Sequence, residues 1–254
     1  TWWELQKVAG EIYDHGVKCP LTTVRFAWVH SENVATQAGE AVVGKLGRVD
    51  AVLVNGMVNV KHLALLASWQ KSRYFHYSGP GREGNRRFLS GECAMLTGES
   101  SLYADAKRAG LDVGIAALPH YDDVYAAKPA DILPDGAGLW LLAGHKKDEY
   151  RLAARFMAFM LRPEVQVEWV KATSYLPMTP AAMKGLRDSG IPQNLLDAAE
   201  KRLSVTRKGS TRARHGPIRD RLHEFLGEEV AFVWTTDRPA KEALDNTARR
   251  TNAA

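Results

Sequence analysis

The chain has 254 residues, of which 45% are hydrophobic and 25% are charged. This is enough to build one large domain or two lobes. No run of about 18 apolar residues occurs, so no membrane-spanning helix is expected. The formal net charge of +5 admits a nucleic acid, a membrane surface or an anionic small molecule as a partner.

The first part of the chain predicts helices separated by short extended segments. Residues 2–15 place apolar side chains at helical spacing, and Gly16 ends the pattern. No signal peptide precedes this helix, so the sequence is expected to be either processed or truncated. The other elements expected in this part are a strand at 19–23, helices at 28–38 and 58–72, and a loop at 73–85.

The middle of the chain predicts a strand at 93–96, a polar turn at 97–101 and a helix at 102–109. The start of a helix presents backbone N–H groups, which makes it a natural place for an anion. Strands and helices alternate along the chain, as is typical of the α/β class. The later elements expected are strands at 113–118 and 138–142 around a loop at 119–135, then helices at 147–161, from Pro163, at 181–188, 194–203, 217–233 and 239–250.

The two cysteines, Cys19 and Cys93, are far apart in sequence and fit no metal-binding spacing. A disulfide between them would suit an oxidising compartment. Two buried free thiols are an equally acceptable interpretation. The sequence leaves both alternatives open.

Much of the excess positive charge lies between residues 202 and 221. A solvated loop and helix face is the simplest interpretation of such a charge pattern. Aromatic residues do not interleave with these cations, as a platform for stacking bases would require, so no nucleic-acid partner is expected. The basic residues concerned are Arg202, Arg207, Lys208, Arg212, Arg214, Arg219 and Arg221.

Sequence signatures of enzymes are absent. There is no phosphate-binding P-loop, dinucleotide fingerprint, Gly-x-Ser-x-Gly string or His-Glu-x-x-His spacing. The pair Asp122-Asp123 falls on an expected loop, where adjacent side chains point apart. We therefore expect no catalytic residue, no metal and no cofactor.

Four short motifs follow one another in a fixed order. They are Thr-Trp at 1–2, Gly-Glu-Cys-Ala-Met at 91–95, Gly-Ala-Gly-Leu-Trp at 136–140, and Trp169 followed by Ser-Tyr-Leu-Pro at 174–177. In this order they resemble the sn-glycerol-3-phosphate-binding family of extracytoplasmic solute-binding proteins, which serve ABC importers. The resemblance covers nearly the whole chain.

The resemblance implies an α/β fold of the two-lobed periplasmic binding protein type (type II), of which this chain looks like the later and larger part. Residues 1–112 would belong to the second lobe, 113–174 to the first lobe, and 175–254 to the second lobe again. A periplasmic or other extracytoplasmic location is implied, and membrane anchoring through a preceding segment stays open. The implied partners are a phosphorylated polyol ligand and the membrane subunits of an ABC permease.

The same resemblance identifies candidate ligand-binding residues. Tyr175 stands where the chain should cross between the lobes, and its phenol could donate to a phosphate or hydroxyl. Gly136 matches a glycine whose backbone N–H faces the ligand, and Trp28 matches one of two tryptophans that wall the glycerol. Arg212 best matches the arginine that clamps the phosphate, with Arg214 as a competitor. The alternatives are a packed tyrosine, an ordinary glycine at a strand start and a core tryptophan.

Two departures from the family pattern bear on the ligand. Arg25 replaces the first wall tryptophan, and Glu99 falls on a ligand-contacting serine, with Ser100 next to it. A carboxylate beside a phosphate would repel it. Glu99 could therefore pair with Arg25, or it could face a cationic group of the ligand, as in glycerophosphocholine.

The expected function is the capture of sn-glycerol-3-phosphate or a glycerophosphodiester by closure of the lobes. One alternative is a neutral sugar or polyol bound by the same fold, which Trp28 and Glu99 would suit. The orientation of Arg212 or Arg214 would discriminate the two. A remote alternative is a nucleic-acid-interacting module, which salt-dependent retention on DNA would reveal.

Overall fold

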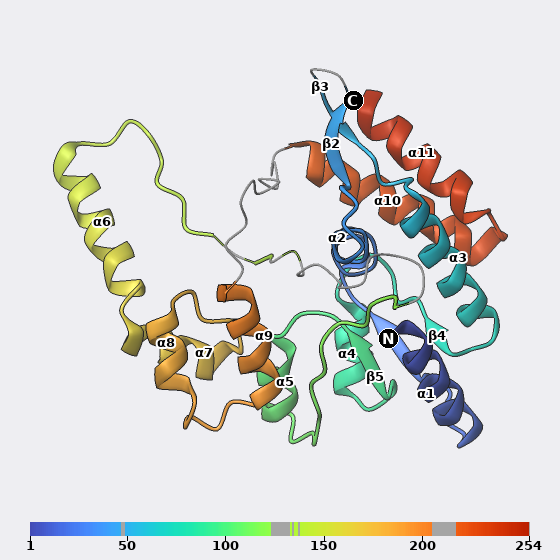
Figure 1. Cartoon of the computed structure of the whole chain (residues 1–254), viewed down its shortest axis with the longest axis horizontal. Helices are drawn as coiled ribbons and strands as arrows, with labels where there is room; N and C mark the ends of the chain where they lie inside the picture. Colours follow the sequence, from blue (N-terminus) through green and yellow to red (C-terminus); the bar gives the residue numbers. More distant parts are fainter. Residues whose placement is uncertain (47–48, 123–132, 134, 137, 205–216, 254) are drawn as a thin grey trace. The chain divides into compact units, whose positions relative to one another are not determined.

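The computed structural model describes residues 1–46, 49–122, 133, 135–136, 138–204 and 217–253, and it divides the chain into two units (Figure 1). Unit 1 comprises Thr1–Glu99, Leu118–Leu133 and Arg207–Ala254. Unit 2 comprises Ser100–Ala117 and Pro134–Thr206. Each unit is a separate packing body, and the expected assignment of segments to lobes stays a prediction.

Unit 1 is built around a short parallel sheet in the order β4 (Phe75–His76), β1 (Leu21–Thr23), β5 (Met95–Thr97). Leu21 of the central strand pairs with Phe75 on one side and Met95 on the other. All of β1 is buried, as expected of a parallel strand covered on both faces. The two threonines of β1 can be buried because each hydroxyl donates to a backbone carbonyl.

Helices surround this sheet. The first, α1 (Trp2–Asp14), begins at a capping box in which the Thr1 hydroxyl accepts from the Glu4 backbone N–H. Its first residue, Trp2, is completely buried. The other helices of unit 1 are η1 (Ala27–Glu32, a π-helical turn), α2 (Asn33–Gln37), α3 (Met57–Lys71), α4 (Glu83–Leu89), α10 (Pro217–Thr236) and α11 (Ala240–Ala253).

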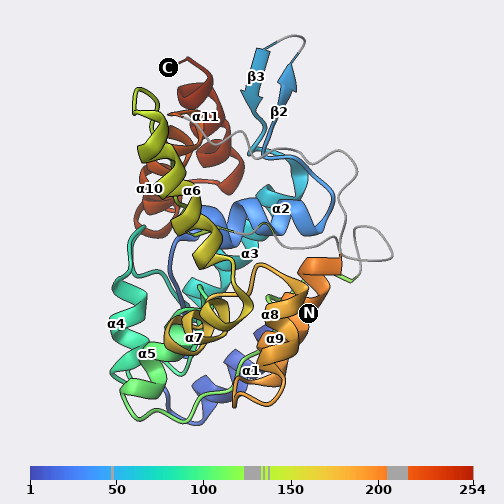
Figure 2. The same ribbon diagram turned by 90° about the vertical axis from the view of Figure 1, so that its left-hand side faces the viewer.

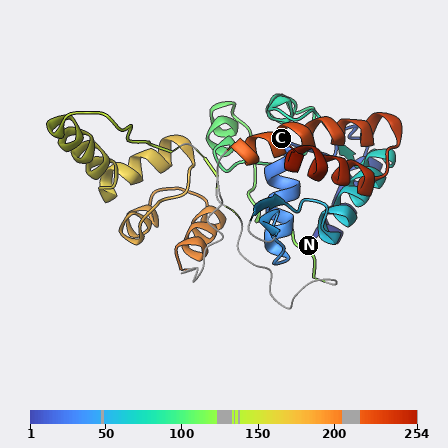
Figure 3. The same cartoon turned by 90° about the horizontal axis from the view of Figure 1, so that it is seen from above.

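The core of unit 1 joins the two ends of the sequence. Helices α10 and α11 lie side by side and contact α3 (Figures 1 and 3). Leu222 and Leu244 from these helices are buried in the same cluster as Trp69 and Phe75. The antiparallel hairpin of β2 (Val43–Leu46) and β3 (Val49–Val52) extends beyond α2, and β3 contacts α11 (Figure 2).

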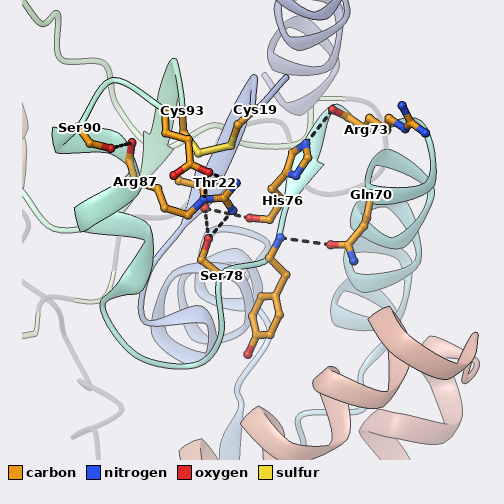
Figure 4. Close-up of a disulfide and its surroundings, with 11 residues drawn as sticks. Cys19, Thr22, Gln70, Arg73, His76, Ser78, Arg87, Ser90 and Cys93 are labelled. Atoms are coloured by element: carbon orange, nitrogen blue, oxygen red, sulfur yellow. Dashed lines mark hydrogen bonds and ion pairs between the residues drawn. A yellow bond between two sulfur atoms is a disulfide. The ribbon is translucent and has the colours of Figure 1, made fainter. Parts of the chain in front are cut away.

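A disulfide joins the starts of two neighbouring strands. Cys19 precedes β1, Cys93 precedes β5, and the two sulfur atoms are bonded (Figure 4). Beside the disulfide, the Thr22 hydroxyl donates to the His76 carbonyl, and Arg87 donates to Ser78. The choice that the sequence left open is thus decided in favour of a disulfide.

Unit 2 contains, in its described part, five helices. Its small core consists of Val170, Met183, Leu186, Leu196 and Ala199. Figure 1 shows α7, α8 and α9 gathered together with α5 beside them. The helices are α5 (Leu102–Arg108), α6 (Lys147–Met160), α7 (Pro163–Thr173), α8 (Pro180–Leu186) and α9 (Gln193–Ser204).

Two strand predictions are wrong. Residues 113–118 and 138–142 form no strand, because the described part of unit 2 offers neither of them a strand partner for a hydrogen-bonded ladder. The loop predicted at 73–85 instead contains β4 and the first turn of α4. The other predicted helices are present within a few residues of their expected bounds. No helix among the described residues is long and apolar enough to cross a membrane.

Candidate functional site

Glu99 is the last residue of the first segment of unit 1, and it lies between two arginines. Arg82 donates to Glu99 Oε2 at 3.3 Å and lies 3.2 Å from Oε1. Arg25 Nη1 lies 3.7 Å from the same Oε1 atom. The Glu99 side chain is only 11% exposed, so its charge needs such compensation. Of the two expectations for this carboxylate, the structure therefore shows the pairing with Arg25, and it adds Arg82.

Trp28 lies on the π-helical turn η1, and Arg25 covers one face of its ring. The guanidinium carbon of Arg25 is 5.0 Å from the ring centroid, which is a cation–π distance. The indole Nε1 donates to the Leu133 carbonyl at 2.9 Å. Trp28 is therefore held at both its polar atom and its π-face, and it is half-buried rather than a core residue.

Arg25 has an unusual backbone. Its φ of +49° lies in the left-handed region, which a residue with a Cβ adopts at a cost of about 1–3 kcal/mol. The Arg25 N–H donates to the Gly81 carbonyl, and the Arg25 carbonyl accepts from Trp28 and Val29. These bonds hold the strained residue at the entry of η1, and π-helical turns are themselves frequent at functional sites.

Gly136 and Tyr175 meet in unit 2. A Cβ built on Gly136 would lie 3.3 Å from a ring carbon of Tyr175, and Gly136 has a φ of +144° that other residues rarely adopt. The Gly136 N–H, which the resemblance aims at the ligand, donates to the Asp135 carboxylate at 2.9 Å. Tyr175 is half-buried and follows Ser174, whose left-handed conformation ends α7.

Ser100 also belongs to unit 2, where its carbonyl accepts from the Tyr103 N–H at the start of α5. Arg212 and Arg214 lie outside the described residues. The structure thus groups the candidate residues into two sets. Unit 1 holds Arg25, Trp28 and Glu99, and unit 2 holds Ser100, Gly136 and Tyr175.

Sequence reasoning missed a second charged cluster in unit 1. Arg219 donates twice to Glu32, at 2.7 and 2.6 Å, and His223 Nε2 lies 3.2 Å from Glu32 Oε2. Burial alone would raise the pKa of Glu32, but the hydrogen bonds and charges of Arg219 and His223 outweigh it and hold the pKa below its usual value. The spacing of Arg219 and His223, four residues apart on one predicted helix, was the available signal.

A neutral network runs through the core behind β1. His62 contacts the Tyr121 hydroxyl at 2.8 Å and His30 at 2.9 Å, and His30 contacts the hydroxyls of Thr23 and Thr97 at 2.9 Å. Burial lowers the pKa of His30 to about 3. Burial, and to a smaller extent the neighbouring His30, holds the pKa of His62 well below its usual value. Both imidazoles are therefore neutral structural groups.

Sequence comparison decides the family. The profile of the bacterial extracellular solute-binding protein family matches residues 1–189. The chain belongs to this family. This solute-binding protein chain is 32% identical over its whole length to the sn-glycerol-3-phosphate-binding periplasmic protein of Rhizobium meliloti (strain 1021), of which it covers 60%. It is 30% identical over 99% of its length to the corresponding protein of Salmonella paratyphi A (strain ATCC 9150 / SARB42), of which it covers 59%.

Solved structures support the fold of this solute-binding protein. A cyclo/maltodextrin-binding protein complexed with maltotetraose matches the whole chain with a TM-score of 0.69 at 18% identity, over 64% of its own length. The maltose/maltodextrin-binding domain MalE of Bdellovibrio bacteriovorus, bound to maltotriose, matches 99% of the chain with a TM-score of 0.72 at 15% identity, over 65% of its own length. The predicted α/β fold of the periplasmic binding type is confirmed, and the chain is a part of it.

Proposed function

We propose that this chain is the larger part of the substrate-binding component of an ABC importer, and that the protein captures sn-glycerol-3-phosphate or a glycerophosphodiester. The observation that carries the proposal is the similarity along the whole chain to sn-glycerol-3-phosphate-binding periplasmic proteins. The chain spans about 60% of the length of these curated relatives, so the activity of the whole protein is included in the proposal. The protein acts outside the cytoplasm, hands its ligand to a permease and catalyses no reaction.

In the proposed mechanism, two lobes close over the ligand, and the closed form docks on the permease. Trp28 walls the polyol on one side. The Tyr175 phenol donates to the ligand, and Ser100 supplies a hydroxyl. Arg212 clamps the phosphate through its guanidinium fork. Gly136 provides the close backbone approach, and for its N–H to reach a ligand the Asp135 carboxylate has to move away.

The charge around Glu99 supports an anionic ligand more than a cationic one. Both Arg25 and Arg82 lie within ion-pair distance of this single carboxylate. The charge of Glu99 is therefore already offset within the protein, and it gives no reason to expect a cationic group on the ligand. Glycerol-3-phosphate is the first candidate on this ground, and glycerophosphocholine is the second.

Calorimetric titration of the protein in its full length tests the proposal. We expect saturable binding of glycerol-3-phosphate, weaker binding of glycerophosphocholine and no turnover of either compound. Glycerol serves as the control for the contribution of the phosphate. Binding of maltotriose with no binding of either phosphorylated compound would refute the proposal.

The arginine clamp has its own test. Arg212→Ala should weaken binding of glycerol-3-phosphate by about 2–5 kcal/mol, the usual cost of removing one partner of a desolvated charge pair. Arg214→Ala is the matched control and should cost less than about 1 kcal/mol. Reversed effects would transfer the role to Arg214, and two silent variants would exclude a clamp at either position.

A neutral sugar or polyol is the second candidate function. The two solved structures named above hold maltotetraose and maltotriose, and a half-buried tryptophan suits a sugar ring. Because Arg25 covers one face of the Trp28 ring, a sugar ring, like the polyol of the first candidate, would have to pack against the other face. The same titration, with maltotriose as ligand, separates the two functions.

A further inference from the structure

Helix α6 of unit 2 carries an apolar stripe that is exposed to solvent. The stripe consists of Leu152, Phe156 and Phe159, which are spaced four and three residues apart and therefore lie on one side of the helix. Their exposed fractions are between 44% and 63%, and no residue of α6, all of which the structure describes, is buried. A helix with such a stripe normally buries it against another layer of the fold.

The exposed apolar surface continues from α6 to α7, the helix into which α6 leads (Figure 1). Phe159 of the α6 stripe also borders an open groove, together with the exposed Trp169 of α7. Single apolar side chains are common on protein surfaces, but a contiguous patch marks a surface that another body covers. The other residues that line the groove are Glu164, Val165, Glu168 and Ala172.

The backbone of unit 2 gives a second, independent observation. Residues 138–142 are a glycine followed by four apolar residues, and all five are exposed. An unbroken apolar run is typical of a strand that is covered on both faces of a sheet. Residues 111–115, which overlap the strand predicted at 113–118, alternate between partly buried and exposed side chains, the period of a strand with one covered face. Among the described residues, neither segment has a strand partner.

Both observations point to a sheet that unit 2 lacks. In α/β domains a sheet buries the apolar stripes of the helices and pairs the backbones of its strands. The described part of unit 2 has five helices and no strand, whereas unit 1 has a parallel sheet of its own. One sheet would cover the α6 stripe and also complete both strand-like segments.

The similarity to longer proteins indicates where this sheet comes from. The chain covers 60% of the Rhizobium meliloti relative, so a large part of that protein has no counterpart in the chain. A lipid surface could cover the α6 stripe, but it offers no hydrogen bonds to a strand backbone. A second copy of the chain would bring the same helical unit, again with no strand in its described part.

We infer that the α6 stripe and residues 138–142 form an interface for a β-sheet supplied by the part of the full-length protein that this chain does not span. Residues 138–142 pair with this sheet as a strand, residues 111–115 join it as a further strand, and α6 packs on one of its faces. The inference concerns the packing of unit 2 and is independent of the ligand that the protein binds.

Cysteine labelling of the full-length protein tests the α6 stripe. Leu152→Cys places a thiol on the stripe, and Ala154→Cys, two positions on and so about 200° round the helix, is the matched control at an exposed position. Wild type serves as the blank, because Cys19 and Cys93 are joined in a disulfide. We expect a maleimide to label the Leu152 variant at least about tenfold more slowly than the Ala154 variant, and both equally fast in urea.

Hydrogen exchange of the wild type, followed by mass spectrometry, tests the strands without any substitution. The backbone amides of residues 138–142 and 111–115 should exchange as slowly as those of β1, the buried central strand of unit 1. Residues 143–146, an exposed loop between the apolar run and α6, are the internal reference and should exchange fast.

Both results have to be obtained on a monomer, which light scattering verifies. Fast exchange at residues 138–142, or equal labelling of the two variants, overturns the inference. Protection that appears only when the protein dimerises assigns the surface to a second copy, and protection that needs phosphatidylglycerol vesicles assigns it to a membrane; either outcome also overturns the inference. Neither readout uses a ligand, so the inference stands if the proposed ligand proves wrong, and its own failure leaves ligand binding untouched.

Discussion

Glu99 illustrates how a single side chain changes meaning once its neighbours are known. As a sequence feature it is a carboxylate where the family pattern has a neutral hydroxyl, which suggested a cationic ligand group. In the structure, Arg25 and Arg82 already supply the opposite charge. The pairing with Arg25 could be anticipated from the two departures occurring together. The contribution of Arg82 could not, because it lies in a stretch whose glycines and proline predicted only a loop.

The first prediction concerns this carboxylate. Glu99→Ser should raise the affinity for glycerol-3-phosphate by roughly 1 kcal/mol, because it removes a negative charge and releases two arginines from an ion pair. The affinity for glycerophosphocholine should rise less and should not fall. Calorimetry of the full-length protein with both ligands measures this. A marked loss of glycerophosphocholine binding would mean that Glu99 faces the ammonium after all.

A second prediction follows from the buried histidines. The pKa of His30 is lowered to about 3 and that of His62 also lies far below its ordinary value, mainly because both are buried. In the unfolded chain each histidine takes up a proton near pH 6.5, whereas in the folded state it stays neutral. The two buried histidines therefore leave the free energy of unfolding unchanged above about pH 6.5. As the pH falls below that value, each lowers it by up to ~1.4 kcal/mol per pH unit.

Urea unfolding at pH 7.5, 6.5 and 5.5, followed by circular dichroism, measures this slope. His62→Gln should reduce the slope of the unfolding free energy against pH by the equivalent of about one bound proton. The variant also weakens the hydrogen-bond network of His30 and His62. His15→Gln, at an exposed position, is the control and should lower the stability much less than His62→Gln does. An identical slope in the His62 variant would contradict the assignment of these buried groups as neutral.

At the scale of elements, helices were easier to predict than strands. Local signals such as the capping box at Thr1 and the proline at the first position of α7 are sufficient to begin a helix, and these helices are present. A strand depends on a partner that lies elsewhere in the sequence. Residues 113–118 and 138–142 have strand-like composition, but the described part of unit 2 provides no ladder for them.

The position of α4 against the sheet depends on one small residue. A Cβ on Gly84 would lie 2.3 Å from the Thr23 carbonyl oxygen, which is too close for any real contact. The glycine therefore lets the helix backbone approach β1 directly. The sequence pattern showed a glycine in an expected loop, and only the packing of α4 on the sheet gives that glycine its reason.

A third prediction tests this contact. Gly84→Ala should lower the free energy of unfolding by about 1–3 kcal/mol, because the added methyl group forces the helix away from the strand. Gly81→Ala is the matched control, since a methyl group there meets nothing within 4 Å. Chemical unfolding of the two variants measures the difference. Equal stability of both would show that α4 can shift without cost.

At the scale of the whole molecule, the positive net charge fits the proposed anionic ligand. Among the described residues, arginines form ion pairs with the carboxylates of Glu99 and Glu32. Unit 2 carries apolar side chains at its surface, among them Trp140 with 85% exposure and Leu142 with 70%. The chain that exposes these side chains spans about 60% of the length of its curated relatives.

The disulfide constrains a large part of the chain. Cys19 and Cys93 are 74 residues apart, and the loop between them contains β1, β4 and the helices from η1 to α4. Closing a loop of this length restricts the unfolded chain and should stabilise the folded state by about 2–5 kcal/mol. Disulfides persist in oxidising compartments, in agreement with a family of extracellular proteins.

The last prediction removes this crosslink. The double variant Cys19→Ala, Cys93→Ala should lose about 2–5 kcal/mol of unfolding free energy, and a reductant should have the same effect on the wild type but none on the variant. Alanine is preferred to serine because both positions are only 2% exposed, and a serine hydroxyl there would be buried without a certain acceptor.

Urea unfolding of the wild type and the variant, each with and without reductant, gives the four free energies of unfolding to compare. Thiol titration of the unfolded, unreduced protein should find no free thiol. If reductant destabilises the variant as much as the wild type, the effect does not come from this bond, and the contribution of the disulfide to stability would have to be abandoned.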